Sequence, residues 1–545
     1  MHLLRGRLPL ATTVLIVLTG SVFLLLQARH LWFFGDDWMF LLERSLSQRP
    51  VEDLMRPHND HWSTVPILIY RALFSVVGLE HYLVFAVLPI LAHAAACILF
   101  FLLLRRCAVH PWIAVGVTTV MVFLGAGAEN LLWSFQIGMI GSAVFGLAAL
   151  LVSTSSSGRR SLGLVWLLSI LSVMTASTAI PMLIWLGAFT LMRDGLRRAL
   201  ALTVPPLIVY AAWFLVWGRE ADTGIEKAPP ADVIPMAWRG LSATWDNMSG
   251  FTGAGPVIVI GLVAASVALQ PGTDRRTLAL SGWGAALVTY MLFAYSRGAF
   301  GPDAATTSRY AYFGALMMLP SLALALDSVR NRLRLRAAEA GLTTAALLGL
   351  LVVPGVFGVI DFRVARAAMT PDLQERVLAA SQLARSGQPL LREQVDPVWN
   401  APISATELQP DDVAEALPDG PVSPRARLTA SAALQVGAAA TSFDLPAAKA
   451  SFAGTETTTS GDCVIGLGAA GAVLEIPSGP AGAQVRLTLS GTDRTTVRLR
   501  DEGATSVPVE LVVADATEVY VGVTAPEVEL LVDLPPGAPF TVCGR

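Results

Sequence analysis

Long apolar runs, separated by short polar segments, fill the first two-thirds of the chain. Many approach the roughly 20 residues that a helix needs to cross a bilayer, and the shorter ones would require tilt or partial burial. The pattern predicts a mainly α polytopic membrane domain of about eleven transmembrane helices within residues 1–360. The runs are Leu8–Leu26, Tyr82–Leu104, Trp112–Gly127, Ile137–Ser153, Leu162–Ala176, Ala179–Met192, Leu200–Trp217, Pro256–Leu269, Leu278–Tyr295, Tyr310–Leu326 and Leu342–Ile360.

Arginine clusters between these runs set the expected orientation, because short cytoplasmic loops carry an excess of basic residues. One further segment, Ser63–Gly78, decides whether the number of membrane crossings before the later loops is odd or even. If it crossed the membrane, the later arginine clusters would lie outside. If it is an amphipathic helix in the outer interface, every cluster from Arg5 to Arg336 is cytoplasmic. We therefore expect a multi-pass plasma-membrane protein with a cytoplasmic N-terminus and an extracytoplasmic C-terminal domain.

The last third of the chain has the pattern of soluble protein. Residues 361–424 are expected to form an extracytoplasmic helix and linker, and residues 425–545 carry short alternating apolar runs broken by Gly, Pro and Asp. This alternation predicts a small antiparallel β-sandwich. An extracytoplasmic location would permit a disulfide between Cys463 and Cys543. Aromatic residues are scarce here, so glycan binding and a purely structural role both remain open.

Composition and motifs narrow the function. Hydrophobic residues make up 54% of the chain and charged residues 14%, and the formal net charge is −3. The lipid bilayer is therefore an expected partner, whereas nucleic acid is not, because the chain has no basic stripe. No nucleotide-binding loop, serine-nucleophile elbow or cofactor fingerprint occurs. An enzyme of this kind would need an activated substrate that reaches it through the lipid.

The first outer loop contains two polar groups that could carry chemistry. Asp36 and Asp37 follow the first apolar run directly. One of them could deprotonate an acceptor hydroxyl or help to hold a divalent cation such as Mg²⁺ or Mn²⁺, or it could cap the next helix. Further along, His58, Asp60 and His61 could contact substrate or position an aspartate, or they could form a hydrogen-bonded turn; their spacing is too loose to define a metal site.

Two later outer segments are also unusually polar. Glu129 and Gln136 could line a sugar pocket with Trp133 as a stacking face, or they could be polar helix ends within an interfacial aromatic belt. Arg297 and Arg309, the latter followed by Tyr310, face outward against the prevailing charge bias. Their guanidinium groups could bind a lipid phosphate, or bulk anionic headgroups.

The segments Phe34–Trp38 and His58–Trp62, followed by the long multi-helix body, resemble the bacterial membrane glycosyltransferases of the GT-C superfamily. The resemblance implies transfer of a sugar from a polyprenyl-phosphate carrier to an envelope glycan or other acceptor hydroxyl, usually with inversion at the anomeric carbon. It also implies that Asp36 or Asp37 is the catalytic base or a metal-linked acid, and that Arg297 or Arg309 holds the donor phosphate. The C-terminal region is similar to β-domains appended to cell-wall glycosyltransferases.

Other classes of membrane protein compete with this hypothesis. A transporter would commonly show repeat halves and charged residues at mid-membrane depth, and neither is evident here. A non-catalytic partner in envelope assembly would not need the aspartate pair. An acyltransferase is disfavoured because the sequence has no His-Asp or Arg-rich motif at a suitable depth.

Overall fold

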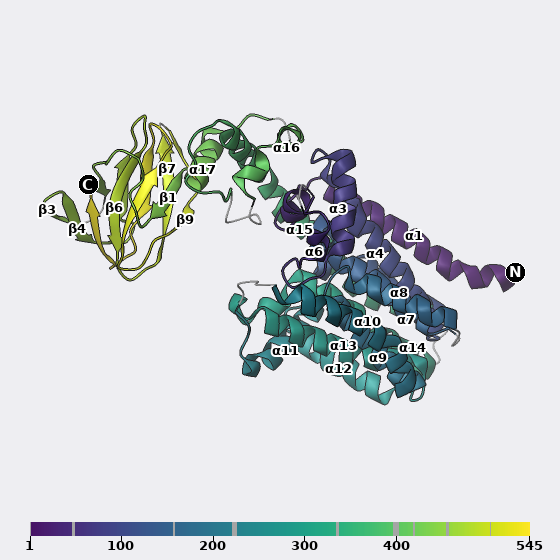
Figure 1. Cartoon of the computed structure of the whole chain (residues 1–545). Helices are drawn as coiled ribbons and strands as arrows, with labels where there is room; N and C mark the ends of the chain where they lie inside the picture. Colours follow the sequence, from purple (N-terminus) through teal and green to yellow (C-terminus); the bar gives the residue numbers. More distant parts are fainter. Residues whose placement is uncertain are drawn as a thin grey trace. The chain divides into compact units, whose positions relative to one another are not determined.

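The computed structural model describes residues 2–45, 49–155, 159–220, 226–333, 337–395, 403–417, 420–453, 457–501 and 503–544. The chain is mostly helical and has a C-terminal all-β domain (Figure 1). It divides into two compact units. Unit 1 comprises Met1–Trp32, Ser47–Leu73 and Tyr82–Ala367, and unit 2 comprises Phe33–Leu46, Phe74–His81 and Ala368–Arg545.

Unit 1 is built from helices that bury apolar side chains against one another. Among the described residues, eight helical segments are long and apolar enough to cross a membrane, and each of the predicted apolar runs overlaps a helix. These eight are candidates by length and composition, and the number eleven remains a prediction. The helices are α1 (His2–Ala28), α2 (Glu52–Met55), α3 (Thr64–Val77), α4 (Tyr82–Arg106), α5 (Pro111–Val122), α6 (Ala128–Leu132), α7 (Ile137–Ser153), α8 (Arg159–Val173), α9 (Ala179–Asp194), α10 (Leu196–Val216), α11 (Pro230–Ser249), α12 (Gly255–Ala268), α13 (Asp274–Ser296), α14 (Ser308–Leu333) and α15 (Ala337–Arg385).

Short helical turns connect several of these helices. Pro111 begins α5, as expected for a residue whose missing N–H is not needed in the first turn, and Gly250 ends α11 in the left-handed conformation that glycine adopts readily. The turns are the π-helix η1 (Met39–Glu43) and the 3₁₀ helices η2 (Gly125–Gly127), η3 (Ser134–Gln136), η4 (Gly218–Glu220), η5 (Gly298–Phe300), η6 (Ala304–Thr306) and η7 (Ala405–Leu408).

Helix α15 is continuous where the sequence pattern suggested a boundary. The apolar run was expected to end at Ile360, but the helix continues to Arg385, and the division of the chain into two units falls within it, between Ala367 and Ala368. The segment after Ile360 is rich in alanine, leucine and arginine, all good helix formers. The helix ends just before Gly387, which has a φ of 74°.

Glycines allow α15 to approach the turn after α5 at backbone distance. A Cβ at Gly355 would lie 1.9 Å from the Phe123 carbonyl oxygen, and a Cβ at Gly125 would lie 2.0 Å from the Gly355 oxygen. Neither neighbour is a flexible side chain that could move away. The close approach therefore requires glycine at both positions.

Substitution of Gly355 tests this close contact. We expect Gly355→Ala to lower the free energy of unfolding of the detergent-solubilised chain by about 1–3 kcal/mol, because overpacking forces the backbones apart. Gly349 lies on the same helix with nothing within 4 Å of its would-be Cβ. Gly349→Ala is the matched control and should leave stability unchanged or slightly raised. Equal unfolding temperatures for the two variants would contradict the contact.

Unit 2 contains a short helical region followed by the β domain. The helix and linker expected over residues 361–424 fall partly outside the described residues. Besides the end of α15, η7 and α16 (Asp411–Glu415) lie within this segment. Helix α17 (Pro424–Leu434) follows, although the alternating pattern was expected from about Ala426. Ser423 caps this helix by accepting the Ala426 N–H at 3.3 Å, and Pro424 occupies the first turn.

The β domain consists of two antiparallel sheets. One has the strand order β1-β10-β6-β12-β4-β3 and the other β2-β5-β11-β7-β8, with β9 also paired to β7. Alternate residues of both sheets enter one hydrophobic cluster, as Val485 and Leu487 do from β6 and Val497 and Leu499 from β7. The strands are β1 (Val436–Ala439), β2 (Ser451–Ala453), β3 (Thr457–Ser460), β4 (Cys463–Leu467), β5 (Val473–Pro477), β6 (Ala483–Leu489), β7 (Arg494–Asp501), β8 (Ala504–Thr505), β9 (Val509–Val512), β10 (Glu518–Val523), β11 (Glu529–Asp533) and β12 (Pro539–Cys543).

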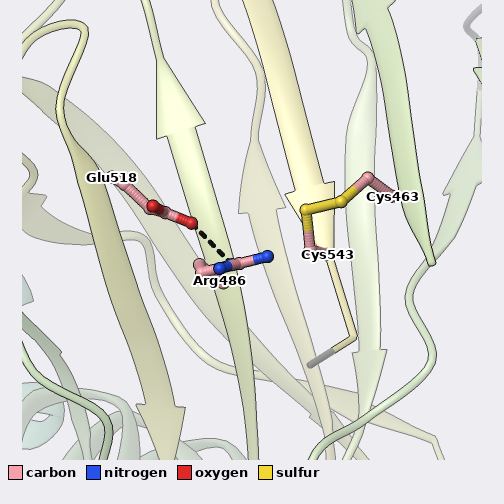
Figure 2. The surroundings of a disulfide bond; sticks show 4 residues. All are labelled: Cys463, Arg486, Glu518 and Cys543. Atoms are coloured by element: carbon pink, nitrogen blue, oxygen red, sulfur yellow. Dashed lines mark ion pairs between the residues drawn. A yellow bond between two sulfur atoms is a disulfide. The ribbon is translucent and has the colours of Figure 1, made fainter. Parts of the chain in front are cut away.

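A disulfide joins the last strand to the strand beside it. Cys463 and Cys543 lie directly opposite each other on β4 and β12 and are covalently bonded (Figure 2). On the other side of β12, Cys543 lies opposite Arg486, which forms an ion pair with Glu518 at 2.5 Å. The bond closes a loop with a sequence separation of 80 residues.

Removal of this disulfide should destabilise the β domain. A loop of this length predicts a loss of about 4.5 kcal/mol in the chain-entropy model. We expect Cys463→Ser with Cys543→Ser in the full chain to unfold at lower temperature and to be insensitive to dithiothreitol. The wild-type chain should fall to the same temperature on reduction. A wild-type chain whose unfolding and non-reducing mobility ignore the reductant would contradict the bond.

Candidate functional site

Several polar residues meet at one end of the helices of unit 1. We call the set Asp60, His61, Glu129, Arg297, Arg309 and Tyr310 the polar cluster. Its first two members lie in the segment between α2 and α3, Glu129 lies on α6, and the other three lie at the end of α13 and the start of α14. All six are sequence-predicted site residues, and the contacts between them join segments that are far apart in the chain.

A tight turn presents Asp60 and His61. The backbones of His58 and His61 exchange two hydrogen bonds of 2.9 Å, and Asn59 between them has a φ of 52°. Asparagine tolerates this left-handed region better than most residues. His58 is fully buried, with its ring 5.2 Å from that of Phe135. The turn predicted as one alternative is therefore present, and it directs the next two side chains into the polar cluster.

Asp60 and Arg297 form the ion pair that joins the two halves of the polar cluster. Arg297 Nη2 lies 3.5 Å from Asp60 Oδ1, and Arg297 Nε donates to the Tyr310 hydroxyl at 3.3 Å. The Tyr310 ring stacks on Phe293 with centroids 3.9 Å apart. Burial raises the pKa of Asp60, but the electrostatic effects of the His61 ring, which is charged only when protonated, and of Arg297 outweigh it and hold this pKa below its usual value.

His61 is held by a residue that the sequence pattern did not single out. Its Nδ1 contacts the Ser177 hydroxyl and accepts the Ser177 backbone N–H at 3.3 Å. Because an N–H can only donate, Nδ1 carries no proton, and the neutral ring holds its proton on Nε2, which lies 3.7 Å from Asp60 Oδ1. Burial lowers the pKa of His61, against the opposing effect of Asp60, so the ring is mostly neutral at pH 7 and Arg297 is the cation that balances Asp60.

Glu129 ties the start of α14 to α6. Its carboxylate lies 3.9 Å from Arg309 Nε, and its backbone N–H donates to the Ser308 hydroxyl at 3.2 Å. The Arg309 guanidinium lies 5.7 Å from the centre of the Tyr310 ring, within the range of a cation–π contact. Arg297 and Arg309 therefore both border Tyr310, and each already has a carboxylate partner.

Trp133 and Gln136 are interior residues. Trp133 is 5% exposed and packs against Phe135 with ring centroids 5.2 Å apart. Gln136 is fully buried, and its Oε1 accepts from Asn130 Nδ2 at 3.3 Å. This burial favours helix-end packing over a sugar-stacking surface for both residues.

Asp36 and Asp37 belong to unit 2. Asp37 is fully buried, and its Oδ2 accepts the Phe34 backbone N–H at 3.2 Å, across a turn in which Gly35 has a φ of 57°. The donor precedes the next helix, so this bond is not the helix cap that was one alternative for the pair, and η1 has Trp38 at its N-cap with no side-chain cap. Asp36 is only partly buried. Within the described residues, no group of three or more His, Cys, Asp or Glu side chains could hold a metal ion. The divalent cation remains a prediction.

The ion pair at the centre of the polar cluster can be tested by a double-mutant cycle on purified chain. We expect Arg297→Met and Asp60→Asn each to lower the unfolding free energy, and the double variant to lose about 1–2 kcal/mol less than the sum. Arg239 and Asp303 form an exposed pair at 3.2 Å, and the cycle on that pair should give a coupling near zero. Equal couplings for the two pairs would contradict a special role for Asp60 and Arg297.

No protein-family model matches the chain, and no curated protein resembles it closely enough to suggest a relative.

Proposed function

We propose that the chain is a membrane glycosyltransferase that moves a sugar from a polyprenyl-phosphate carrier to an acceptor hydroxyl on the extracytoplasmic side. The observation that supports it most is the polar cluster, in which Arg297 and Arg309 flank one tyrosine at an end of apolar helices. Two guanidinium groups at an end of apolar helices suit a lipid-linked phosphate, because its oxygens accept several charge-assisted hydrogen bonds. In this interpretation the two sheets of unit 2 form an extracytoplasmic β-sandwich.

The proposed reaction is a displacement at the anomeric carbon. The acceptor oxygen forms a bond to that carbon, the bond from the carbon to the phosphate oxygen breaks, and its electron pair leaves with polyprenyl phosphate. A base takes the acceptor proton, and the sequence resemblance assigns this role to Asp36 or Asp37. Arg297 would stabilise the charge that develops on the leaving phosphate. Its ion pair with Asp60 must then loosen or be shared as phosphate binds.

Envelope analysis of a deletion strain tests the proposal. Complementation with wild type should restore one missing sugar linkage, whereas either Asp36→Asn or Asp37→Asn should reduce it by about 10²–10⁴-fold, the usual contribution of a general base. Asparagine retains an oxygen that accepts the Phe34 N–H, so Asp37→Asn should still fold. Unchanged glycans in the deletion strain, or full restoration of the linkage by both variants, would contradict the proposal.

One observation favours acyl transfer as a second candidate. The His61 ring lies between the Ser177 hydroxyl and the Asp60 carboxylate. A nucleophile, a base and an orienting group have this arrangement in acyl-transfer enzymes. In such a reaction Ser177 Oγ would add to an acyl carbon, His61 Nδ1 would take its proton, and that proton would leave with the displaced alcohol or thiol.

A serine-directed probe separates the two candidates. The glycosyltransferase hypothesis predicts that Ser177→Ala keeps most of its sugar transfer and that a fluorophosphonate does not label Ser177 in the wild-type chain. Covalent labelling of Ser177, lost in His61→Asn, would instead favour acyl transfer.

A further inference from the structure

A cavity of about 490 Å³ lies beside the polar cluster and entirely within unit 1. Its walls come from the turn before α6, the end of α11, the first residue of α14 and the middle of α15. The side chains that give it chemical character are Asp246, Asn247, Ser308, Phe357, Asp361 and Phe362. The volume is within the usual range for small-molecule sites.

The charge of this cavity differs from that of the polar cluster. Two carboxylates, Asp246 and Asp361, line it, and none of its lining residues is Lys, Arg or His. Asp246 is held in place because its Oδ1 accepts the Gly255 N–H at 2.6 Å. Ionised carboxylates only accept hydrogen bonds, so a ligand must bring donors. A phosphate would be repelled, whereas neutral hydroxyl groups would form charge-assisted hydrogen bonds.

A divalent cation fits the cavity less well than a sugar does. Calcium takes six to eight oxygen ligands and magnesium demands near-ideal octahedral geometry, whereas the lining of this cavity supplies two carboxylates, those of Asp246 and Asp361. The rings of Phe357 and Phe362 contribute apolar surface on the α15 side. Apolar rings combined with a few fixed polar groups match the two faces of a sugar ring, which carries C–H bonds and hydroxyl groups.

The cavity adjoins the residues that would bind the donor. Ser308 lines the cavity and its hydroxyl accepts the Glu129 N–H, while the next residue, Arg309, forms an ion pair with that same Glu129. A ligand in the cavity would therefore be separated from Arg309 by a single residue of α14. An acidic cavity beside a cluster that contains two guanidinium groups would hold a neutral glycan and a phosphate apart and in a fixed order.

We propose that this cavity binds the sugar portion of the acceptor, a neutral and hydroxyl-rich glycan. Its role as the acceptor site rests on the proposed glycosyltransferase function, but the binding does not. The same hydroxyl chemistry could be presented by a free oligosaccharide or by the headgroup of a glycolipid. The experiment below separates these two sources.

Cysteine protection measures occupancy directly in the full chain. Asn247→Cys, reconstituted in phosphatidylcholine nanodiscs, is labelled with a maleimide in the presence of each probe. The probes are neutral oligosaccharides of the cell envelope, the corresponding glycolipid, inorganic phosphate and Mg²⁺. The native thiols give little background, because Cys97 and Cys107 are buried and the other two cysteines are bonded to each other. Arg239→Cys on the same helix is outside the cavity and serves as the matched control.

We expect the oligosaccharide, the glycolipid or both to slow labelling at position 247 and not at position 239. Protection by the glycolipid alone would assign the source to the membrane. In the same background, Asp361→Asn should weaken protection about tenfold, the loss expected for one hydrogen bond to a charged group. Phe357→Ala should weaken it as well, and the unfolding temperature of each variant checks that the chain is folded.

Three results would overturn the proposal: protection by Mg²⁺ or phosphate in place of glycan, no protection by any probe, or glycan protection that ignores both cavity variants. Because the readout is binding, it is independent of sugar transfer. Protection by glycan in a chain whose deletion leaves the envelope linkages unchanged would keep the binding site and reject the glycosyltransferase function.

Discussion

The ion pair between Asp60 and Arg297 is the contact on which the polar end of unit 1 depends. A partly buried carboxylate at the end of apolar helices is costly without a cation, and Arg297 supplies it. The same arginine donates to Tyr310, while Asp60 lies beside the Nε2–H of His61, which is anchored on Ser177. One charge pair thus connects the segment before α3, the turn before α9 and the loop between α13 and α14.

Backbone contact between two glycines positions one wall of the acidic cavity. Gly355 on α15 and Gly125 in η2 approach so closely that neither could carry a Cβ, and this fixes the part of α15 that bears Phe357 and Asp361. Close backbone packing therefore positions a wall of the acidic cavity, whereas ion pairs hold the arginines of the polar cluster. The cavity carries two carboxylates, whereas the polar cluster pairs two arginines with two carboxylates. The two sites would therefore suit different ligands.

Most of the architecture follows from the pattern of apolar and polar residues. Apolar runs predicted the helices of unit 1, and period-two alternation predicted strands after α17, because each pattern reflects burial on one face. The continuity of α15 was not predicted, because the end of an apolar run marks a change in the polarity of the side chains and not the end of a helix. The helix continues with polar residues and ends shortly before Gly387.

The candidate site was only partly predictable. Asp60, Arg297 and Arg309 stood out as charges in apolar surroundings, but their pairing depends on tertiary packing that spacing along the chain does not encode. Ser177 gave no signal, since a serine between two helices is ordinary. Trp133 and Gln136 were expected either to line a sugar pocket or to belong to an interfacial aromatic belt with polar helix ends, and only the fold shows that they are buried.

Direct transfer by purified protein is the most decisive measurement. The full chain in nanodiscs would be given a polyprenyl-phosphate sugar labelled in the sugar, together with acceptor glycans from the envelope. We expect the label to move to the acceptor, polyprenyl phosphate to be released, and Arg297→Met to lose most of this activity while remaining folded. Label that stays on the lipid with folded wild-type protein, or transfer that is indifferent to Arg297, would contradict the proposed function.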